Sequence, residues 1–183
     1  MSFMIARPLL KRVFWDAMTV IARPLMGFLG MLLCALPVAA LADEQVLKRL
    51  DSTGRELAKR PCITPLSTGV KRLLNQHVPS VQDVIVTLRC HGLVSETYHA
   101  YSYKPVAVLP LTLPISAPHQ SLPKELQVGA SFAGVMRMLG QPMFRQGSVI
   151  TYSLSFESPG EDTISFADKS GRIAAITWAW AVD

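Results

Sequence analysis

The sequence predicts an α+β fold in which helices pack on one face of an antiparallel sheet. Two observations in the last third of the chain predict it. Apolar residues between positions 132 and 139 recur at i, i+3, i+4 and i+7, which is the spacing of one helix face. Three later runs alternate apolar residues with small or polar ones, as strands with one buried face do. These runs are residues 148–156, 162–167 and 172–182.

Both ends of this helix are marked in the sequence. Ser131 is expected to cap the N-terminus, because its hydroxyl can accept a hydrogen bond from the free amides of the first turn. Gly140 followed by Pro142 is a stop signal. We therefore expect a helix and a three-stranded meander over residues 126–183, with a structural motif formed by Gly129, Ser131, Val135, Leu139, Gly140 and Pro142.

The N-terminal segment of the chain resembles the signal peptide of an exported protein. Arg23 is a charged residue ahead of the short apolar run from Leu25 to Leu36, and residues 40–42 form an A-x-A cleavage site. An apolar run of about twelve residues is too short to span a bilayer comfortably. We expect residues 1–42 to be a signal peptide cleaved after Ala42, and the protein to be periplasmic.

Two details of this segment affect its interpretation. The sequence of residues 5–9 recurs at 21–25, with Met18 just before the second copy, so translation could start at Met18. Cys34 follows Leu33, whereas a lipoprotein signal has a small residue immediately before its cysteine. No lipid anchor is therefore predicted.

The mature chain, residues 43–183, is long enough for one domain with a core. Removal of residues 1–42 takes away four basic residues and one acidic residue, and the net charge falls from +5 to +2. That balance is not typical of nucleic-acid binding. Cys62 and Cys90 remain, and in an oxidising compartment they are expected to form a disulfide worth roughly 3 kcal/mol.

Residues 43–104 are expected to form an N-terminal helical part with one strand. The apolar spacing predicts helices over 43–59, from Ser67 or Thr68 to 78, and over 80–92, followed by a strand over 93–103. Basic residues are frequent in the first two of these helices. Such a run is usually a solvated helix face, but it could also contact a protein partner or an anionic envelope surface. The candidates are Arg55, Lys59 and Arg60.

Residues 105–125 contain several prolines, which cannot donate to a strand ladder. We expect an edge strand followed by an extended linker that divides the chain. The apolar positions of 80–88 and 131–139 match at a constant offset of 51 residues. This could reflect a tandem duplication, or only the similarity of capped amphipathic helices, and the sequence favours neither.

Two tryptophans on the last strand, Trp178 and Trp180, share a face with Ile176. If that face meets the helices, the indoles belong to the core; if it faces away, they form an aromatic patch that could bind protein. Tyr152 on a neighbouring strand is a third aromatic candidate for partner binding.

No motif for catalysis is recognisable in the sequence. His77, Cys90, His91 and His99 lack the spacing of a zinc site, and neither a G-x-S-x-G elbow nor a phosphate-binding glycine loop is present. The acidic residues Glu157, Glu161 and Asp162 lie at a predicted turn. We predict a protein without a cofactor, a metal or a catalytic residue, and thus not an enzyme.

The motif of residues 128–142, with Tyr152, the strand at 164–166 and the run from Gly171 to Ile176, resembles the SmpA/OmlA-like family. Its members are small envelope lipoproteins associated with outer-membrane β-barrel assembly, and β-lactamase inhibitor protein shares their fold. The resemblance covers about residues 126–183 and implies a helix packed on a three-stranded sheet. Two functions follow as expectations: a periplasmic protein that binds another protein, as an inhibitor or immunity factor, or an accessory factor in envelope biogenesis.

Overall fold

A computed structural model describes residues 44–155 and 157–182. All described residues belong to one compact unit of the chain. The predicted signal peptide, its cleavage site, Met18 and Cys34 lie outside the described residues. No described helix is long and apolar enough to cross a membrane.

The described residues form two α-helices, one short 3-10 helix and eight strands. Their order is α1 (Glu44–Lys59), β1 (Ser67–Leu74), β2 (Gln82–Cys90), β3 (Leu93–Ala100), β4 (Ala107–Ile115), η1 (Lys124–Leu126), α2 (Phe132–Leu139), β5 (Phe144–Gln146), β6 (Val149–Ser153), β7 (Thr163–Lys169) and β8 (Arg172–Ala179).

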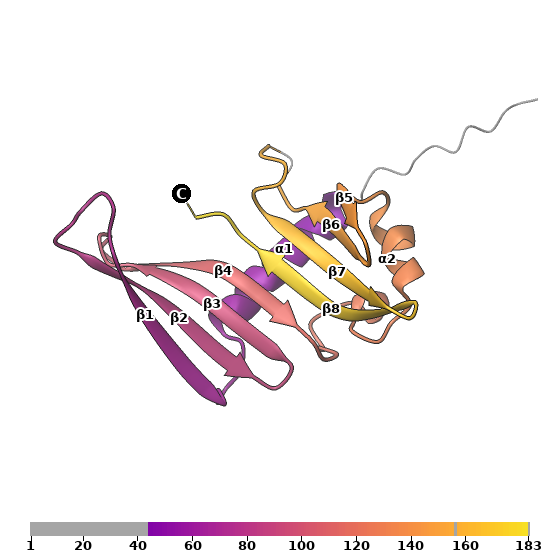
Figure 1. Cartoon of the computed structure of the whole chain (residues 1–183), viewed down its shortest axis with the longest axis horizontal. Coiled ribbons are helices and arrows are strands. Elements are labelled where there is room, and N and C mark those ends of the chain that lie inside the picture. Colours follow the sequence, from indigo (N-terminus) through magenta and orange to yellow (C-terminus); the bar gives the residue numbers. More distant parts are fainter. Residues whose placement is uncertain (1–43, 156, 183) are drawn as a thin grey trace, which may run out of the picture. The chain divides into compact units, whose positions relative to one another are not determined.

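All eight strands belong to one antiparallel sheet with the order β1-β2-β3-β4-β8-β7-β6-β5 (Figure 1). Each half of the sheet is a meander, and the last strands of the two meanders, β4 and β8, pair in the middle. Each meander also follows an α-helix in the chain. The two halves therefore form one continuous sheet, because the hydrogen bonds of β4 and β8 join them.

The predicted fold class is wrong in its balance of elements. The protein is dominated by the eight-stranded sheet, with only two α-helices among the described residues. The helices predicted over 67–78 and 80–92 are the strands β1 and β2. The run from Val84 to Thr87 consists of β-branched residues, which favour strands. A continuous apolar run fits the spacing of a helix face and the alternation of a strand equally well, so spacing alone could not distinguish them. Pairing of β2 with strands on both sides selects the extended form.

The tandem repeat proposed at an offset of 51 residues is also wrong. Its first copy corresponds to the strand β2, whereas its second copy is the helix α2. The matched apolar positions therefore have different structures in the two places, and only the similarity of their spacing remains.

The edge strand predicted in the proline-rich segment is wrong, because β4 lies in the middle of the sheet between β3 and β8. Two of its prolines fall where the β3–β4 ladder is irregular. Pro110 pairs with Thr97 beside a register shift, and Pro114 lies in the gap between the pairs Leu93–Ile115 and Glu96–Thr112. Prolines are thus accommodated in a central strand at points where regular hydrogen bonding already fails.

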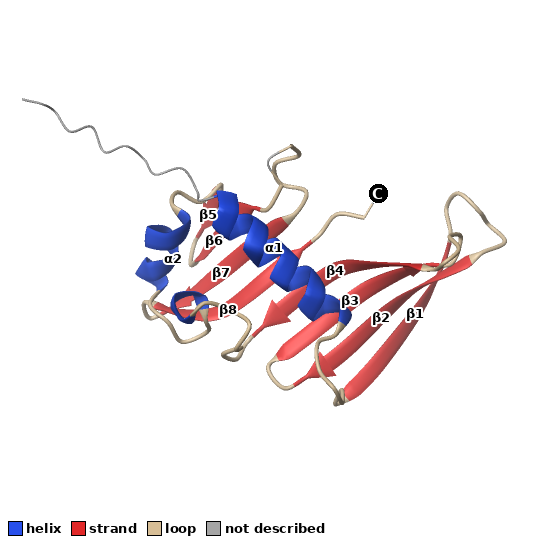
Figure 2. Ribbon diagram, turned by 180° about the vertical axis from the view of Figure 1, so that it is seen from behind, coloured by secondary structure: helices blue, strands red, loops and turns tan. Residues whose placement is uncertain are grey.

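The core lies between the helices and one face of the sheet. Figure 2 shows α1 across this face, and α1 contacts β3 and β4. Buried residues of both α-helices and of β3, β4, β6, β7 and β8 belong to a single hydrophobic cluster. Gly54 allows α1 to approach the sheet closely, since a Cβ at this position would lie 2.6 Å from Nε1 of Trp178. Trp178 in turn donates to the carbonyl of Leu50 at 3.2 Å.

The helix predicted in the C-terminal part is confirmed as α2, and its meander is confirmed as β6, β7 and β8, with the short β5 in addition. Val135 and Leu139 are fully buried, and Gly140 ends the helix with a positive φ of 74° while donating to the carbonyl of Met136. Ser131 occupies the N-cap position, but its hydroxyl makes no capping hydrogen bond. The amide of Phe132 instead donates to the carbonyl of Gly171 in the β7–β8 turn.

Candidate functional site

The two faces of the sheet differ in chemistry. The face that meets the helices carries large apolar side chains, such as Phe166 and Trp178, and these are fully buried. The alternate residues of the same strands point to the opposite side, which no described helix covers (Figure 1). We call this opposite side the open face. The alternation in the sequence predicted these two faces for the C-terminal strands.

One row of side chains crosses the open face from β1 to β6. Its members are paired in register across seven neighbouring strands, and all but one are Gly, Ala, Ser or Thr. Short side chains leave the sheet surface low and accessible to another surface. The row consists of Gly69, Thr87, Glu96, Thr112, Ala179, Thr163 and Ser153.

Glu96 is the charged member of this row. Its carboxylate accepts hydrogen bonds from the hydroxyls of Thr87 at 3.3 Å and Thr112 at 3.2 Å, on the strands at either side. The side chain is half-buried, so the two threonines orient the carboxylate without hiding it. A carboxylate held in this way has acceptor capacity left for a donor from a partner.

A second row lies beside the first in the C-terminal half. Thr177, Ser165 and Thr151 are in register on β8, β7 and β6, and the hydroxyls of Ser165 and Thr151 are 2.8 Å apart. The row ends at Phe144 on β5, which pairs with Thr151 and has 62% of its surface exposed. The open face thus combines small hydroxyl side chains with an exposed aromatic ring at one edge.

At the other end of the sheet, Asp83 is fully buried without a cationic partner in the described residues. It accepts hydrogen bonds from the Tyr98 hydroxyl, from the Tyr101 amide at 2.8 Å and from the Asn75 side chain at 2.6 Å. The bond from Tyr98, helped by the other two, holds the pKa of Asp83 below its usual value although burial opposes this. The same bond raises the pKa of Tyr98 to about 12. This cluster joins the β1–β2 loop to the β3–β4 loop.

Three of the six candidate partner-binding residues lie in the core. Trp178, Trp180 and Tyr152 face the helices and are 0%, 5% and 1% exposed. The indole of Trp180 donates to Asp51 of α1 at 2.8 Å, and the Tyr152 hydroxyl donates to the carbonyl of Gly140 at 3.0 Å. Burial raises the pKa of Tyr152 to about 12. These aromatic residues support the fold and are not available to a partner.

The basic candidates in the last turns of α1 and directly after it divide into two kinds. Arg55 pairs with Asp51 and with Asp162, and its guanidinium lies 5.7 Å from the ring centre of Trp180. It therefore ties α1 to the β6–β7 loop. Lys59 and Arg60 are exposed and line a groove of about 620 Å³ at the end of α1. The other residues that line it are Thr53, Glu56, Leu57 and Ser121.

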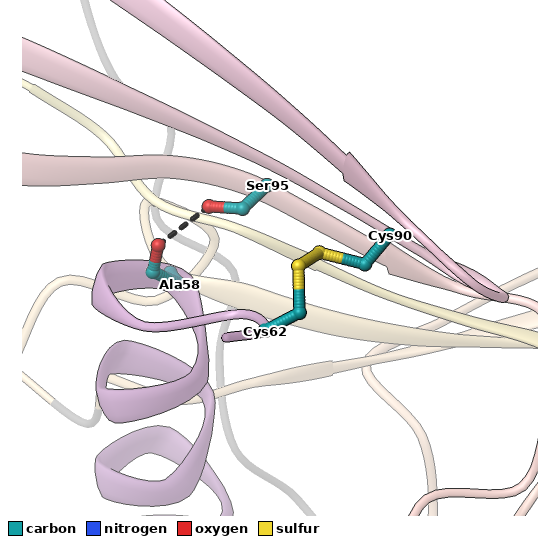
Figure 3. The surroundings of a disulfide bond; sticks show 4 residues. All are labelled: Ala58, Cys62, Cys90 and Ser95. Carbon is teal, nitrogen blue, oxygen red and sulfur yellow. Dashed lines mark hydrogen bonds between the residues drawn. A yellow bond between two sulfur atoms is a disulfide. The ribbon is translucent and has the colours of Figure 1, made fainter. Parts of the chain in front are cut away.

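The predicted disulfide is confirmed between Cys62 and Cys90. Figure 3 shows it beside the end of α1, where the hydroxyl of Ser95 donates to the carbonyl of Ala58 at 2.6 Å. Ser95 thereby satisfies a carbonyl that the last turn of a helix leaves free. The disulfide and this hydrogen bond together attach the end of α1 to β2 and β3.

The histidines considered as metal ligands are separated in the structure. His77 and His91 are exposed in different turns, while His99 is 3.0 Å from the hydroxyl of Thr97. Cys90 is in the disulfide. Within residues 44–155 and 157–182, no three His, Cys, Asp or Glu side chains are placed to hold a metal ion.

Sequence reasoning missed Glu96 and the N-terminal half of the open face. The signal was present in residues 93–100, where Ser95 and Thr97 alternate with Glu96 and Tyr98, but both sets contain polar residues. Because residues 80–92 were predicted to be a helix, no neighbouring strand indicated which of the two sets faces the core.

Comparison with protein families, with curated proteins and with solved structures finds no match to this chain. The resemblance to the SmpA/OmlA-like family therefore stays a prediction that rests on the motif within residues 126–183. Any functional conclusion depends on the surfaces of the molecule itself.

Proposed function

We propose that this is an exported, non-enzymatic protein that binds another protein through the open face of its sheet, and that it acts as an inhibitor or immunity factor. The open face is the observation that carries the proposal. It spans strands from both halves of the sheet, a row of mostly short side chains crosses it from β1 to β6, and no described helix covers it.

Physical considerations support a protein as the ligand. A row of short side chains on a hydrogen-bonded sheet lets a partner approach closely and loses little side-chain entropy on binding. Glu96 offers a fixed anionic contact, and Phe144 offers an exposed aromatic one. Surfaces of this kind bind a protein whose contacting loops fill the low surface and whose basic side chain meets the carboxylate.

The disulfide and the predicted signal peptide support an extracytoplasmic setting for this partner. A disulfide forms and persists in an oxidising compartment such as the periplasm. The resemblance to a fold that includes an inhibitor of an envelope-acting enzyme favours inhibition or immunity over other kinds of binding, as an argument by analogy.

The test compares two variants of equal chemistry on opposite sides of the protein. Thr177→Arg places a long cationic side chain on the open face, and Ser52→Arg places the same side chain on the exposed side of α1. Purified wild-type protein is immobilised and incubated with a periplasmic extract, and retained proteins are identified by mass spectrometry. Their affinities for the purified protein are then measured by calorimetry.

We expect a partner with micromolar or tighter affinity that Thr177→Arg weakens by about 2 kcal/mol, roughly thirtyfold, while Ser52→Arg leaves it unchanged. If no periplasmic protein binds, or if both variants bind as the wild type does, the open face is not the binding site. Recovery of outer-membrane assembly subunits would favour the role in envelope biogenesis.

A further inference from the structure

The outermost strand of the N-terminal half, β1, has an exposed edge. It is eight residues long and pairs with β2 on one side, and in the described part of the chain no strand pairs with its other side. At the opposite end of the sheet the edge strand β5 has three residues. Short edge strands protect a sheet from unwanted pairing, whereas a long exposed edge is a template for another strand.

The ladder geometry identifies the backbone groups that are free. The amide of Asn75 donates to the carbonyl of Val81 at 3.0 Å, which makes this pair a hydrogen-bonded one. Hydrogen-bonded positions alternate along an antiparallel strand, so residues 67, 69, 71 and 73 direct their N–H and C=O groups toward β2. The groups of Thr68, Val70, Arg72 and Leu74 point away from the sheet. An added strand could pair with all four residues.

Two exposed apolar side chains lie on the helix side of this edge, with Arg72 between them. Val70 and Leu74 are 63% and 70% exposed, and Val70 pairs with the half-buried Val86 on β2. The side chains of these residues point to the helix side of the sheet, but α1 packs against β3 and β4 and does not extend over β1. An incoming strand would cover this apolar surface with its own alternate side chains.

The charge of the β1–β2 hairpin selects the partner. Its exposed charges are all positive, from Lys71, Arg72 and Arg89, while the acid in this hairpin, Asp83, is buried and fully hydrogen-bonded. A second copy of this strand would bring cations near cations, which disfavours self-pairing. A lipid surface would leave the free N–H and C=O groups without partners.

We infer that the free edge of β1 binds an extended acidic segment of a partner protein as an added strand, with its apolar residues beside Val70 and Leu74 on one side and its carboxylates beside Lys71 on the other. This surface is distinct from the row that crosses the open face, because it uses the free strand edge and, apart from Lys71, side chains on the helix side of the sheet. The inference does not depend on the proposed function.

The probe is an acetylated and amidated peptide of sequence TVEVEVT, and the matched control is TVKVKVT. Affinities are measured by fluorescence anisotropy with labelled peptides, and the site is located from amide chemical-shift changes in the folded protein. We expect the acidic peptide to bind with a Kd of about 10–100 μM that weakens as salt is added, and the basic peptide to bind at least about tenfold more weakly. The shift changes should lie in residues 66–74.

Backbone pairing is tested with Val70→Pro, which removes an outward N–H and leaves the β1–β2 ladder intact, and with Val70→Ala, which keeps that N–H. We expect Val70→Pro to bind the acidic peptide about tenfold more weakly than Val70→Ala. Lys71→Gln tests the charge without a backbone change and should weaken binding about threefold, whereas Arg72→Gln, which removes a charge on the side of Val70 and Leu74, is the matched control and should have a smaller effect. Thr177→Arg on the open face should have no effect.

Three results would overturn the inference. The first is no binding of the acidic peptide up to about 1 mM, or equal binding of both peptides. The second is equal binding by Val70→Pro and Val70→Ala while circular dichroism shows both to be folded. The third is that the edge of β1 binds something else. This would be shown by saturable binding to phosphatidylglycerol vesicles, or by dimerisation in sedimentation equilibrium, if Val70→Ala abolishes it and the acidic peptide does not compete with it.

Discussion

Replacement of Gly54 by alanine is expected to destabilise the protein, although alanine is the better helix former. In an exposed helix the substitution would stabilise by roughly 0.5–1 kcal/mol. At position 54 the new Cβ would lie 2.6 Å from Nε1 and 2.7 Å from Cδ1 of Trp178. Trp178 is fully buried, so its ring cannot move aside without displacing other core residues.

The expected size of the effect follows from these contacts. Overpacking of a core costs about 1–3 kcal/mol, and loss of the hydrogen bond from Trp178 to the Leu50 carbonyl costs about 1 kcal/mol more. After the gain in helix propensity is subtracted, we expect Gly54→Ala to lower the free energy of unfolding by about 1–3 kcal/mol.

The measurement is urea unfolding followed by tryptophan fluorescence. Ser52→Ala, in the same helix but exposed, is the matched control and should be neutral or slightly stabilising. Combination of Gly54→Ala with Trp178→Phe should cost less than the sum of the single variants, since the smaller ring leaves room for the methyl group. If Gly54→Ala is as stable as Ser52→Ala, the close packing of α1 on Trp178 is not what selects glycine.

Three further expectations concern stability. Replacement of both Cys62 and Cys90 by alanine should lower the free energy of unfolding by about 3 kcal/mol in the same urea experiment, whereas a change below about 1 kcal/mol would mean that the disulfide constrains the unfolded chain little. Tyr98 and Tyr152 each have a pKa raised from 10.0 to about 12, so their contribution to the free energy of unfolding is complete below pH 10 and is lost as the pH rises toward 12. Tyr98→Phe and Tyr152→Phe should each reduce this loss of stability at alkaline pH. Asp83 has a pKa below its ordinary value of 3.8, so its contribution to stability is present above pH 3.8 and is lost as the pH falls through the folded value. The Asp83→Asn variant should be destabilised at pH 7 and less sensitive to acid.

Local signals were sufficient for the C-terminal part of the fold. The helix α2 could be predicted because its apolar spacing, its N-cap position and Gly140 lie within a few residues of one another. The meander β6–β8 could be predicted because one face is apolar and the other is small or polar. The disulfide followed from a single pair of cysteines in a chain expected to be exported.

The N-terminal strands could not be predicted in the same way. In β2 every residue from Val84 to Leu88 is half-buried, so neither face stands out and the spacing also fits a helix. Much of the candidate site could not be predicted for the same reason. Lys59 and Arg60 were found from charge alone and are exposed as expected of basic residues, whereas Glu96 and the edge of β1 become visible only when the register of neighbouring strands is known.

Elements with local signals could be predicted from the residues alone: the helix α2 with its ends, the three C-terminal strands with their two faces, and the pairing of Cys62 with Cys90. Tertiary structure alone decided that residues 67–90 are strands, that the proline-bearing β4 joins the two halves of the sheet, and that the tryptophans face α1. The physical reason is that strand hydrogen bonds and close contacts such as Gly54 against Trp178 connect residues far apart in the chain. Local spacing carries no information about such partners.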